Sequence, residues 1–506
     1  MTAGSDADDL GALLDDVALP VVDDEAMVGL ALGVVRDGGL AAWRGYGWSH
    51  LGAARRVVPS TLFRIGSITK TFTAVACLQL VERGLVSLDD PVAEHLRSYR
   101  WQQPPRTRPA TLRDVLTHTG GVGEFRTWRD ALDTTTNGMG LPWGTPAPAL
   151  AEYYGGVLRA VVAPGERYAY ANHAVATLGQ VVEDVTGEPF ARYVHEQVFA
   201  PLGLHRTAFR VTPALAGDVA GGYELRRGRV RSVPWRELAV EAAGSVVSST
   251  DDMARYVAAL LGGGANRTGR VLREATLADM FRPHWRSHPS MPGLGLGVEL
   301  DDAEGHRLVG HDGGVPGFVS SMLVAPDDRV GVLAFCNSGS VAVPALAGQV
   351  MRALLDVPQL TTAQARRRVP AAPHLWAELA GVYAPPRGGT ANVRLLGLGL
   401  ELEVLVRDGH LVLRSPVGPL RGGVRLVAVD AEDPLRFETV DASGRVPRLL
   451  RVAFARDGAG RIAGLAVGPY RFERRPWLRG MRHAATAAGA GAATAVGLAL
   501  LSRRAR

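Results

Sequence analysis

The sequence predicts an α/β (α+β) fold, in which an antiparallel sheet is flanked by helices and a small C-terminal β-barrel follows. Strand-like segments lie at 27–35 and 40–46 and again at 318–325 and 330–336, with helical segments between the two pairs. This order is typical of helices packed on an antiparallel sheet. After residue 376, short alternating runs such as HLVLRSP and RLVAVD recur between turn residues at intervals of roughly eight to twelve residues, which indicates a barrel or sandwich.

The first strand pair and the helix after it are marked most clearly. Residues 36–39 (RDGG) form the turn between the two strands. From 68 to 83 apolar residues recur at helical spacing, and Gly84 is a natural stop. Ser67 and Lys70 therefore stand at the first turn of a largely buried helix, three residues apart on one face.

The remaining elements of the first part follow in order. Helical spacing predicts further helices at 111–117, 148–162, 174–186 and 251–261. The later strands are joined by the turn Pro326-Asp327-Asp328.

Length and composition divide the chain into parts. Its 506 residues exceed one ordinary core, and 47% hydrophobic and 21% charged residues are normal for a globular protein. We expect an α+β domain over 1–356, a linker over 357–375, a barrel over 376–475 and a basic, apolar tail over 476–506.

The formal charge of +6 does not indicate a nucleic-acid partner. The arginines are scattered and mixed with 50 acidic residues, and no basic helix is interleaved with aromatic residues. The densest clusters are Arg366 to Arg368 in the expected linker and Arg474 to Arg506 near the end of the chain. No zinc-ligand spacing and no nucleotide loop occur, so neither a metal nor a cofactor is expected.

The two ends of the chain differ. The acidic start MTAGSDADDLGALLDD lacks the basic and apolar regions of a signal peptide, so a cytoplasmic location is expected. Residues 484–501 carry no charge and are flanked by arginines, but they fall short of the about 20 residues of a spanning helix. Most of them are Ala and Gly, which enter lipid weakly. The segment is a candidate membrane contact, and a disordered or loosely helical tail is the alternative.

Lysine occurs once in the chain, at Lys70, whereas 55 residues are arginine. Arginine can replace lysine wherever only a positive charge is needed, but a guanidinium does not give up its proton. The single lysine therefore points to a position that needs an amine.

Ser67 and Lys70 form the pattern Ser-x-x-Lys. A serine hydroxyl is a weak nucleophile near neutral pH and needs a base within hydrogen-bond reach. A lysine one helical turn later can be that base where burial favours its neutral form. The N-terminus of the helix also places the positive end of its dipole beside the reacting carbonyl. A capped helix with an exposed lysine is the alternative.

The second candidate stretch is Tyr170-Ala171-Asn172. A phenol beside a lysine ammonium can ionise and shuttle protons. An asparagine offers both a donor and an acceptor to a substrate amide. A loop tyrosine followed by an Asn turn is the alternative.

The third candidate stretch is His311-Asp312-Gly313-Gly314. Paired glycines let a substrate approach the backbone closely, and an oxyanion hole needs two N–H groups aimed at the developing charge. We expect these donors to be the N–H groups of Ser67 and Gly314. An ordinary glycine turn beside a surface histidine is the alternative.

In this order, the three motifs resemble those of the class C β-lactamase and penicillin-binding-protein superfamily of serine hydrolases. The resemblance covers about residues 20–355, and five stretches support it: LFRIGSITKTFTA, TLRDVLTHTGGV, PGERYAYANHAVATLGQVVEDVTG, AAGSVVSSTDDMARYVAAL and GHDGGVPGF. Residues after about 376 resemble the lipocalin-like barrel that some of these hydrolases carry, with 379–383 (LAGVY) as its opening.

The resemblance implies a role for each candidate residue. Ser67 would be the acylated nucleophile and Lys70 its proton acceptor. Tyr170 would help to deprotonate Ser67 or the nucleophile of deacylation. Asn172 would bind the acyl side of the substrate. His311, with Gly313, would line the opposite wall of the site and hydrogen-bond near Tyr170.

One position departs from the family's pattern. True β-lactamases and D-Ala-D-Ala carboxypeptidases usually have lysine where His311 stands, whereas histidine is more usual in the family's esterases, D-amino-acid-specific peptidases and peptide-cyclising thioesterases. We therefore expect a serine hydrolase of the esterase or D-amino-acid peptidase type, acting on a small molecule or short peptide. The alternatives are a thioesterase or peptide cyclase, a β-lactamase or carboxypeptidase, and a non-catalytic binding protein.

Overall fold

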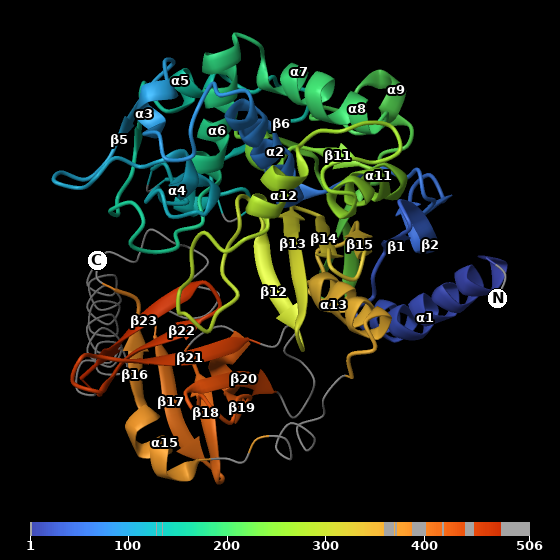
Figure 1. The fold of residues 1–506 in the computed structure, drawn as a ribbon. Coiled ribbons are helices and arrows are strands. Elements are labelled where there is room, and N and C mark those ends of the chain that lie inside the picture. Colours follow the sequence, from blue (N-terminus) through green and yellow to red (C-terminus); the bar gives the residue numbers. More distant parts are fainter. Residues whose placement is uncertain are drawn as a thin grey trace, which may run out of the picture. The chain divides into compact units, whose positions relative to one another are not determined.

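The computed structural model describes residues 3–127, 129–133, 135–358, 369, 372–386, 401–416, 419–440 and 450–476. The chain divides into two compact units (Figure 1). Unit 1 comprises Met1–Arg286 and Pro292–Gln359, and unit 2 comprises Ser287–Met291 and Leu360–Arg506. Most of the expected linker 357–375 and all of the candidate membrane contact 484–501 lie outside the described residues.

Unit 1 is built on a seven-stranded antiparallel sheet with the order β12-β13-β14-β15-β1-β2-β3. Its strands are β1 (Gly29–Arg36), β2 (Gly39–His50), β3 (Arg55–Arg56), β12 (Glu299–Ala303), β13 (His306–Val315), β14 (Phe318–Ala325) and β15 (Val330–Cys336). Because β1 pairs with β15, the early and late strands of unit 1 meet inside one sheet, as the sequence predicts.

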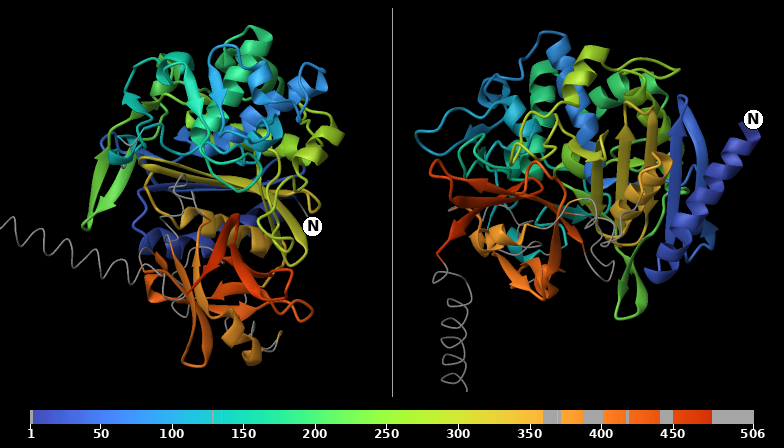
Figure 2. Two further views of the ribbon diagram at one scale, coloured as in Figure 1. Left: turned by 90° about the vertical axis from the view of Figure 1, so that its left-hand side faces the viewer. Right: turned by 60° about the horizontal axis from the view of Figure 1, so that its bottom comes forward.

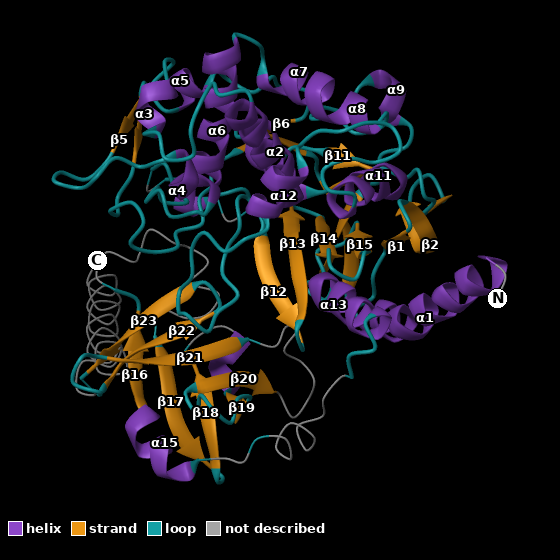
Figure 3. Ribbon diagram, in the orientation of Figure 1, coloured by secondary structure: helices purple, strands orange, loops and turns teal. Residues whose placement is uncertain are grey.

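Helices lie on both faces of this sheet (Figure 3). The helices of unit 1 are α1 (Ala3–Asp24), α2 (Thr69–Glu82), α3 (Val92–His95), α4 (Leu112–Leu116), α5 (Leu150–Tyr153), α6 (Asn172–Thr186), α7 (Phe190–Val194), α8 (Ala200–Leu202), α9 (Pro213–Ala216), α10 (Glu241–Gly244), α11 (Thr250–Leu261), α12 (Glu274–Met280) and α13 (Val343–Leu354). Helical turns of other types are the 3₁₀ turns η1 (Gly66–Ile68) and η2 (Asp130–Leu132) and the π-helical turn η3 (His195–Phe199).

Four short strand pairs complete unit 1. They are β4 (Phe63–Arg64) with β11 (Val247–Ser248), β5 (Arg100–Gln102) with β7 (Val157–Arg159), β6 (Gly140–Pro142) with β10 (Arg236–Leu238), and β8 (Gly222–Arg226) with β9 (Arg229–Val233).

Side chains of the central strands alternate between two apolar layers, because successive residues of a strand point to opposite faces. Leu30 and Leu32 of β1 pack in the cluster that contains α1 and α13. Ala31 and Val35 pack in the larger cluster that contains α2 and α11. Figure 2 shows the sheet between these two layers of unit 1.

The helix predicted over 148–162 is wrong beyond its first turn. Helix α5 ends at Tyr153, and strand β7 begins at Val157. Gly155 and Gly156 lie between them with φ of +61° and +78°. This left-handed backbone is open to glycine and ends a right-handed helix.

Unit 2 contains a closed antiparallel barrel of eight strands. They are β16 (Gly381–Ala384), β17 (Leu402–Arg407), β18 (His410–Arg414), β19 (Val424–Ala428), β20 (Arg436–Val440), β21 (Arg451–Arg456), β22 (Ile462–Val467) and β23 (Tyr470–Arg475), preceded by helix α15 (Pro373–Leu379). Alternate inward side chains, such as Val404 and Phe454, fill its core. The predicted fold class, an α+β unit and a β-barrel, is confirmed. Within the described ranges, none of the helices combines the length and the apolar character that crossing a membrane requires.

Candidate active site

Ser67 lies in the turn η1, directly before helix α2. Where the sequence predicts one helix over 68–83, the structure has the 3₁₀ turn followed by α2. Most of the side chains of α2 are buried, because small and apolar residues run all the way round this helix. Lys70 on its first turn is therefore only 1% exposed, and Ser67 is 8% exposed.

The Lys70 amine makes three short contacts. Its Nζ lies 2.9 Å from Ser67 Oγ, 2.7 Å from Asn172 Oδ1 and 2.6 Å from the carbonyl oxygen of Ala243. The last two oxygens can only accept hydrogen bonds, so two N–H bonds of Lys70 point at them. The third direction of the amine points at Ser67. In the neutral amine this direction is the lone pair, which is the arrangement that a base needs to accept the Ser67 proton.

Tyr170 approaches the same hydroxyl. Its phenol oxygen lies 2.7 Å from Ser67 Oγ, and Lys70 Nζ lies 4.9 Å from the centre of its ring. The Tyr170 side chain is 1% exposed. Ser67 Oγ thus has an amine on one side and a phenol on the other, and both are groups that exchange protons.

His118 supports the ring of Tyr170. The two rings stack with their centroids 4.3 Å apart and their planes inclined by 29°. The backbone of His118 has a φ of +54°, and its carbonyl oxygen accepts a hydrogen bond of 2.8 Å from the N–H of Ala169. These contacts fix the chain segment that leads into Tyr170.

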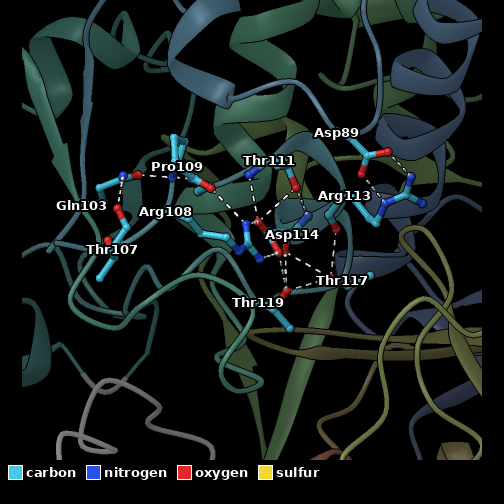
Figure 4. Close-up of polar contacts among 11 residues, drawn as sticks. Asp89, Gln103, Thr107, Arg108, Pro109, Thr111, Arg113, Asp114, Thr117 and Thr119 are labelled. Atoms are coloured by element: carbon cyan, nitrogen blue, oxygen red, sulfur yellow. Dashed lines mark hydrogen bonds and ion pairs between the residues drawn. The ribbon is translucent and has the colours of Figure 1, made fainter.

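A buried carboxylate fixes the loop that carries His118 (Figure 4). Asp114 accepts hydrogen bonds of 2.6 and 2.7 Å from the guanidinium of Arg108, and of 2.9 and 3.0 Å from the backbone and hydroxyl of Thr111. Thr111 and Asp114 form the capping box of α4. The Thr119 N–H donates to the Asp114 carbonyl oxygen at 2.7 Å, which closes the turn at His118.

Asn172 is the first residue of helix α6, and both ends of its amide are engaged. Its Oδ1 accepts from Lys70, and its Nδ2 donates a hydrogen bond of 2.7 Å to Oε1 of Glu124. Glu124 is 4% exposed. The neighbouring ring of His173 adds no positive charge at neutral pH, because burial lowers the pKa of His173 to about 4.

Strand β13 runs beside η1, and two glycines allow the close approach. A Cβ on Gly313 would lie 2.0 Å from the carbonyl oxygen of Ile65, and a Cβ on Gly66 would lie 2.8 Å from Gly314 N. Gly66 also has a φ of +52°. Gly313 and Gly314 belong to strand β13 rather than to a turn. The backbone nitrogen of Gly314 lies beside Gly66, which directly precedes Ser67. The oxyanion pair of Ser67 and Gly314 N–H groups stays a prediction.

His311 lies two residues before Gly313 on β13, so its side chain is on the same face of the strand. It is 5% exposed, and its Nδ1 lies 2.6 Å from the carbonyl oxygen of Asp312. A carbonyl only accepts, so Nδ1 carries a hydrogen. The expected contact between His311 and Tyr170 stays a prediction.

The structure brings Ser67 and Lys70 together with Tyr170 and Asn172, which lie about a hundred residues later in the chain, and hydrogen bonds join Ser67 to Lys70 and Tyr170, and Lys70 to Asn172. Among the described residues, no group of three or more His, Cys, Asp or Glu side chains is arranged to hold a metal ion. Sequence patterns did not indicate Glu124, which is a single acidic residue in a loop.

Among families of known proteins, the chain matches the one described as Beta-lactamase, over residues 14–355. It is similar to Protein flp of Staphylococcus aureus (strain N315), at 24% identity over 63% of this chain and 61% of that protein. It is also similar to unguisins hydrolase ungD of Aspergillus violaceofuscus, at 27% identity over 61% of this chain and 58% of that protein. The chain thus spans about three fifths of the length of these curated relatives.

Two solved structures share the fold over most of the chain. The octameric penicillin-binding protein homologue from Pyrococcus abyssi has a TM-score of 0.60 and 24% identity, and the match covers 91% of this chain and 98% of that one. The structure of SurE with D-Leu also has a TM-score of 0.60 and 24% identity, covering 93% of this chain and 100% of that one.

Proposed function

This chain belongs to the Beta-lactamase family, and from that membership we propose that it is a serine hydrolase that acts through an acyl-enzyme. Its substrate is an ester or amide bond in a small molecule or short peptide. The observation that carries the proposal is the position of Ser67 Oγ, 2.9 Å from the only lysine of the chain and 2.7 Å from a phenol.

The reaction begins with proton transfer from Ser67 Oγ to Lys70 Nζ as the oxygen attacks the substrate carbonyl. The N–H groups of Ser67 and Gly314 stabilise the resulting oxyanion. The tetrahedral intermediate collapses as the leaving group takes a proton through Tyr170 or Lys70. Water then attacks the acyl-enzyme, with the same pair removing its proton. Lys70 and Tyr170 both touch Ser67 Oγ, so we treat them as one coupled proton-transfer unit.

Three considerations favour an ester or a peptide over a β-lactam as substrate. His311 stands where true β-lactamases have lysine, and a histidine is a weaker, pH-dependent partner for a substrate carboxylate. One relative is named as a hydrolase of unguisins, and one structural neighbour was solved with D-Leu. The D-Leu of that structure favours a substrate that carries a D-amino-acid residue.

One assay tests this proposal. The full chain is tested against p-nitrophenyl esters, D-amino-acid amides, peptidyl thioesters and nitrocefin, with Ser67→Ala as the matched control. We expect turnover of an ester or D-amino-acid amide that Ser67→Ala abolishes, and little turnover of nitrocefin. Efficient nitrocefin hydrolysis would make the protein a β-lactamase. If no substrate is turned over and a fluorophosphonate does not label Ser67, the protein is a binding protein that keeps the fold.

Transfer of the acyl group to an amine is the second candidate, and D-Leu, with which a structure of the same fold was solved, carries an amine that could accept an acyl group. A thioesterase or peptide cyclase uses the same acyl-enzyme, but a substrate amine replaces water. Mass spectrometry of the products from a linear peptidyl thioester separates the two functions. A product lighter than the hydrolysed acid by one water indicates cyclisation.

A further inference from the structure

A buried carboxylate is linked through the side chain of Asn172 to Lys70, one of the two proton-transfer groups. This carboxylate belongs to Glu124. Its Oε1 accepts a hydrogen bond of 2.7 Å from Asn172 Nδ2, and Asn172 Oδ1 in turn lies 2.7 Å from Lys70 Nζ. Glu124 is 4% exposed, so this contact is shielded from water.

The chemistry of the two neighbours allows one orientation of the Asn172 amide. An ionised carboxylate only accepts hydrogen bonds, so it must face the NH₂ end of the amide. Lys70 offers N–H donors, so it must face the oxygen end. If the amide were flipped, NH₂ would face an amine and oxygen would face a carboxylate, and both hydrogen bonds would be replaced by repulsive contacts.

From this arrangement we propose that Glu124 is a positioning residue of the active site, which holds the Asn172 oxygen toward Lys70 and thereby aims the Lys70 amine at Ser67. The inference deepens the proposed function and rests on it. It also leaves Asn172 with one N–H and one oxygen lone pair, which are available to a substrate amide.

Without Glu124, the orientation of Asn172 is set by Lys70 alone. The Asn172 side chain is partly exposed, so its NH₂ group can turn to water once the carboxylate is gone. Lys70 then loses the Asn172 oxygen as an acceptor and keeps the Ala243 carbonyl oxygen. The amine can rotate, so its lone pair is no longer held toward Ser67 Oγ. Loss of a hydrogen bond to a charged group should slow acylation about ten- to a hundredfold.

The test compares Glu124→Leu, which removes the acceptor at similar size, with Glu124→Gln, whose side-chain oxygen can still accept from Asn172. The readouts are kcat/KM for an ester and the rate at which a fluorophosphonate labels Ser67. We expect Glu124→Leu to lose about ten- to a hundredfold on both and Glu124→Gln to restore most of the loss. Glu183→Gln is the control, since Glu183 is another partly buried carboxylate, on the same helix as Asn172, bonded to the N–H of Phe190. Thermal unfolding of each variant reports on folding.

A double-mutant cycle separates positioning from a merely structural role. If Glu124 acts through Asn172, Glu124→Leu has no further effect on the labelling rate in an Asn172→Ala background. An equal loss in both backgrounds would overturn the inference, as would a Glu124→Leu protein that is labelled as fast as the wild type. If the wild-type protein itself is neither active nor labelled, the proposed function falls, and this inference with it.

Discussion

At the scale of single residues, the chemistry depends on the hydrogen bonds that orient the Lys70 amine. Two of the oxygens that Lys70 Nζ contacts, the Asn172 amide oxygen and the Ala243 carbonyl oxygen, only accept hydrogen bonds. The proton shared with Ser67 is therefore the one that can move. A guanidinium at this position has the charge but cannot take up a further proton.

Lys70→Arg is accordingly expected to lower kcat/KM by about 10²–10⁴, the usual contribution of general acid–base catalysis. The measurement is ester hydrolysis at neutral pH, with thermal unfolding to show that the variant is folded. If Lys70→Arg retained most of the activity, the base would have to be another group.

Burial of His173 makes stability depend on pH. Burial lowers the pKa of His173 to about 4 from its usual 6.5, so the folded protein binds fewer protons than the unfolded chain between these values. Stability therefore falls as pH drops through this window, by about 2 kcal/mol from pH 7.5 to pH 5. Denaturant unfolding at both values checks this. In His173→Gln, the loss of unfolding free energy between pH 7.5 and pH 5 should be smaller by about 2 kcal/mol. In the control His195→Gln, which changes an exposed histidine, the loss should be as large as in the wild type. An unchanged drop in His173→Gln would contradict the assignment.

The sequence could predict those site residues that fall in motifs and could not predict those that act through contact alone. Ser67, Lys70, Tyr170 and Asn172 stand in short patterns whose residue types are tied to a reaction. Glu124 has no such pattern, because its proximity to Asn172 exists only after a loop and helix α6 are folded together.

At the scale of elements, the contact between strand β13 and turn η1 aligns the two backbones of the predicted oxyanion hole. Gly313→Ala would place a Cβ 2.0 Å from the carbonyl oxygen of Ile65 and so push the two segments apart. We expect kcat/KM to fall by about 10²–10³, the cost of losing one oxyanion donor.

Gly348→Ala is the control for this substitution, because a Cβ at Gly348 in helix α13 meets no atom within 4 Å. It should leave activity unchanged and should not lower the thermal stability. A Gly313→Ala protein with wild-type kinetics would show that the close approach is not needed for catalysis.

Elements with strong periodicity were predictable, and the failures have local causes. Strands β14 and β15 coincide with the predicted 318–325 and 330–336 because their apolar runs end at clear turns. The expected helix over 148–162 fails at Gly155 and Gly156, whose positive φ values turn the chain into β7. Spacing of apolar residues alone does not reveal such a break.

At the scale of the whole molecule, the reacting groups and all of their hydrogen-bond partners named above lie in unit 1. Unit 2 has an apolar core of its own inside the barrel. The fold class could be predicted because both units follow regular strand and helix patterns. The division into units could not be predicted in full, because residues 287–291 belong to unit 2 although they are flanked in sequence by residues of unit 1.

A chain that ends at Gln359 is therefore expected to keep the rate at which a fluorophosphonate labels Ser67. The measurement is the labelling rate of the shortened and the full chain at equal concentration, with circular dichroism as the folding check. A shortened chain that is folded but not labelled would show that the barrel takes part in the chemistry of Ser67.

The role of Ser67 as nucleophile is tested most directly by locating a covalent adduct on it. Trypsin cuts after Arg64 and Lys70, so a fluorophosphonate-labelled protein should release the peptide Ile65–Lys70 with the added mass on Ser67. We predict one such adduct per chain and none in Ser67→Ala. An adduct on another residue, or no adduct under conditions that label a known serine hydrolase, would contradict it.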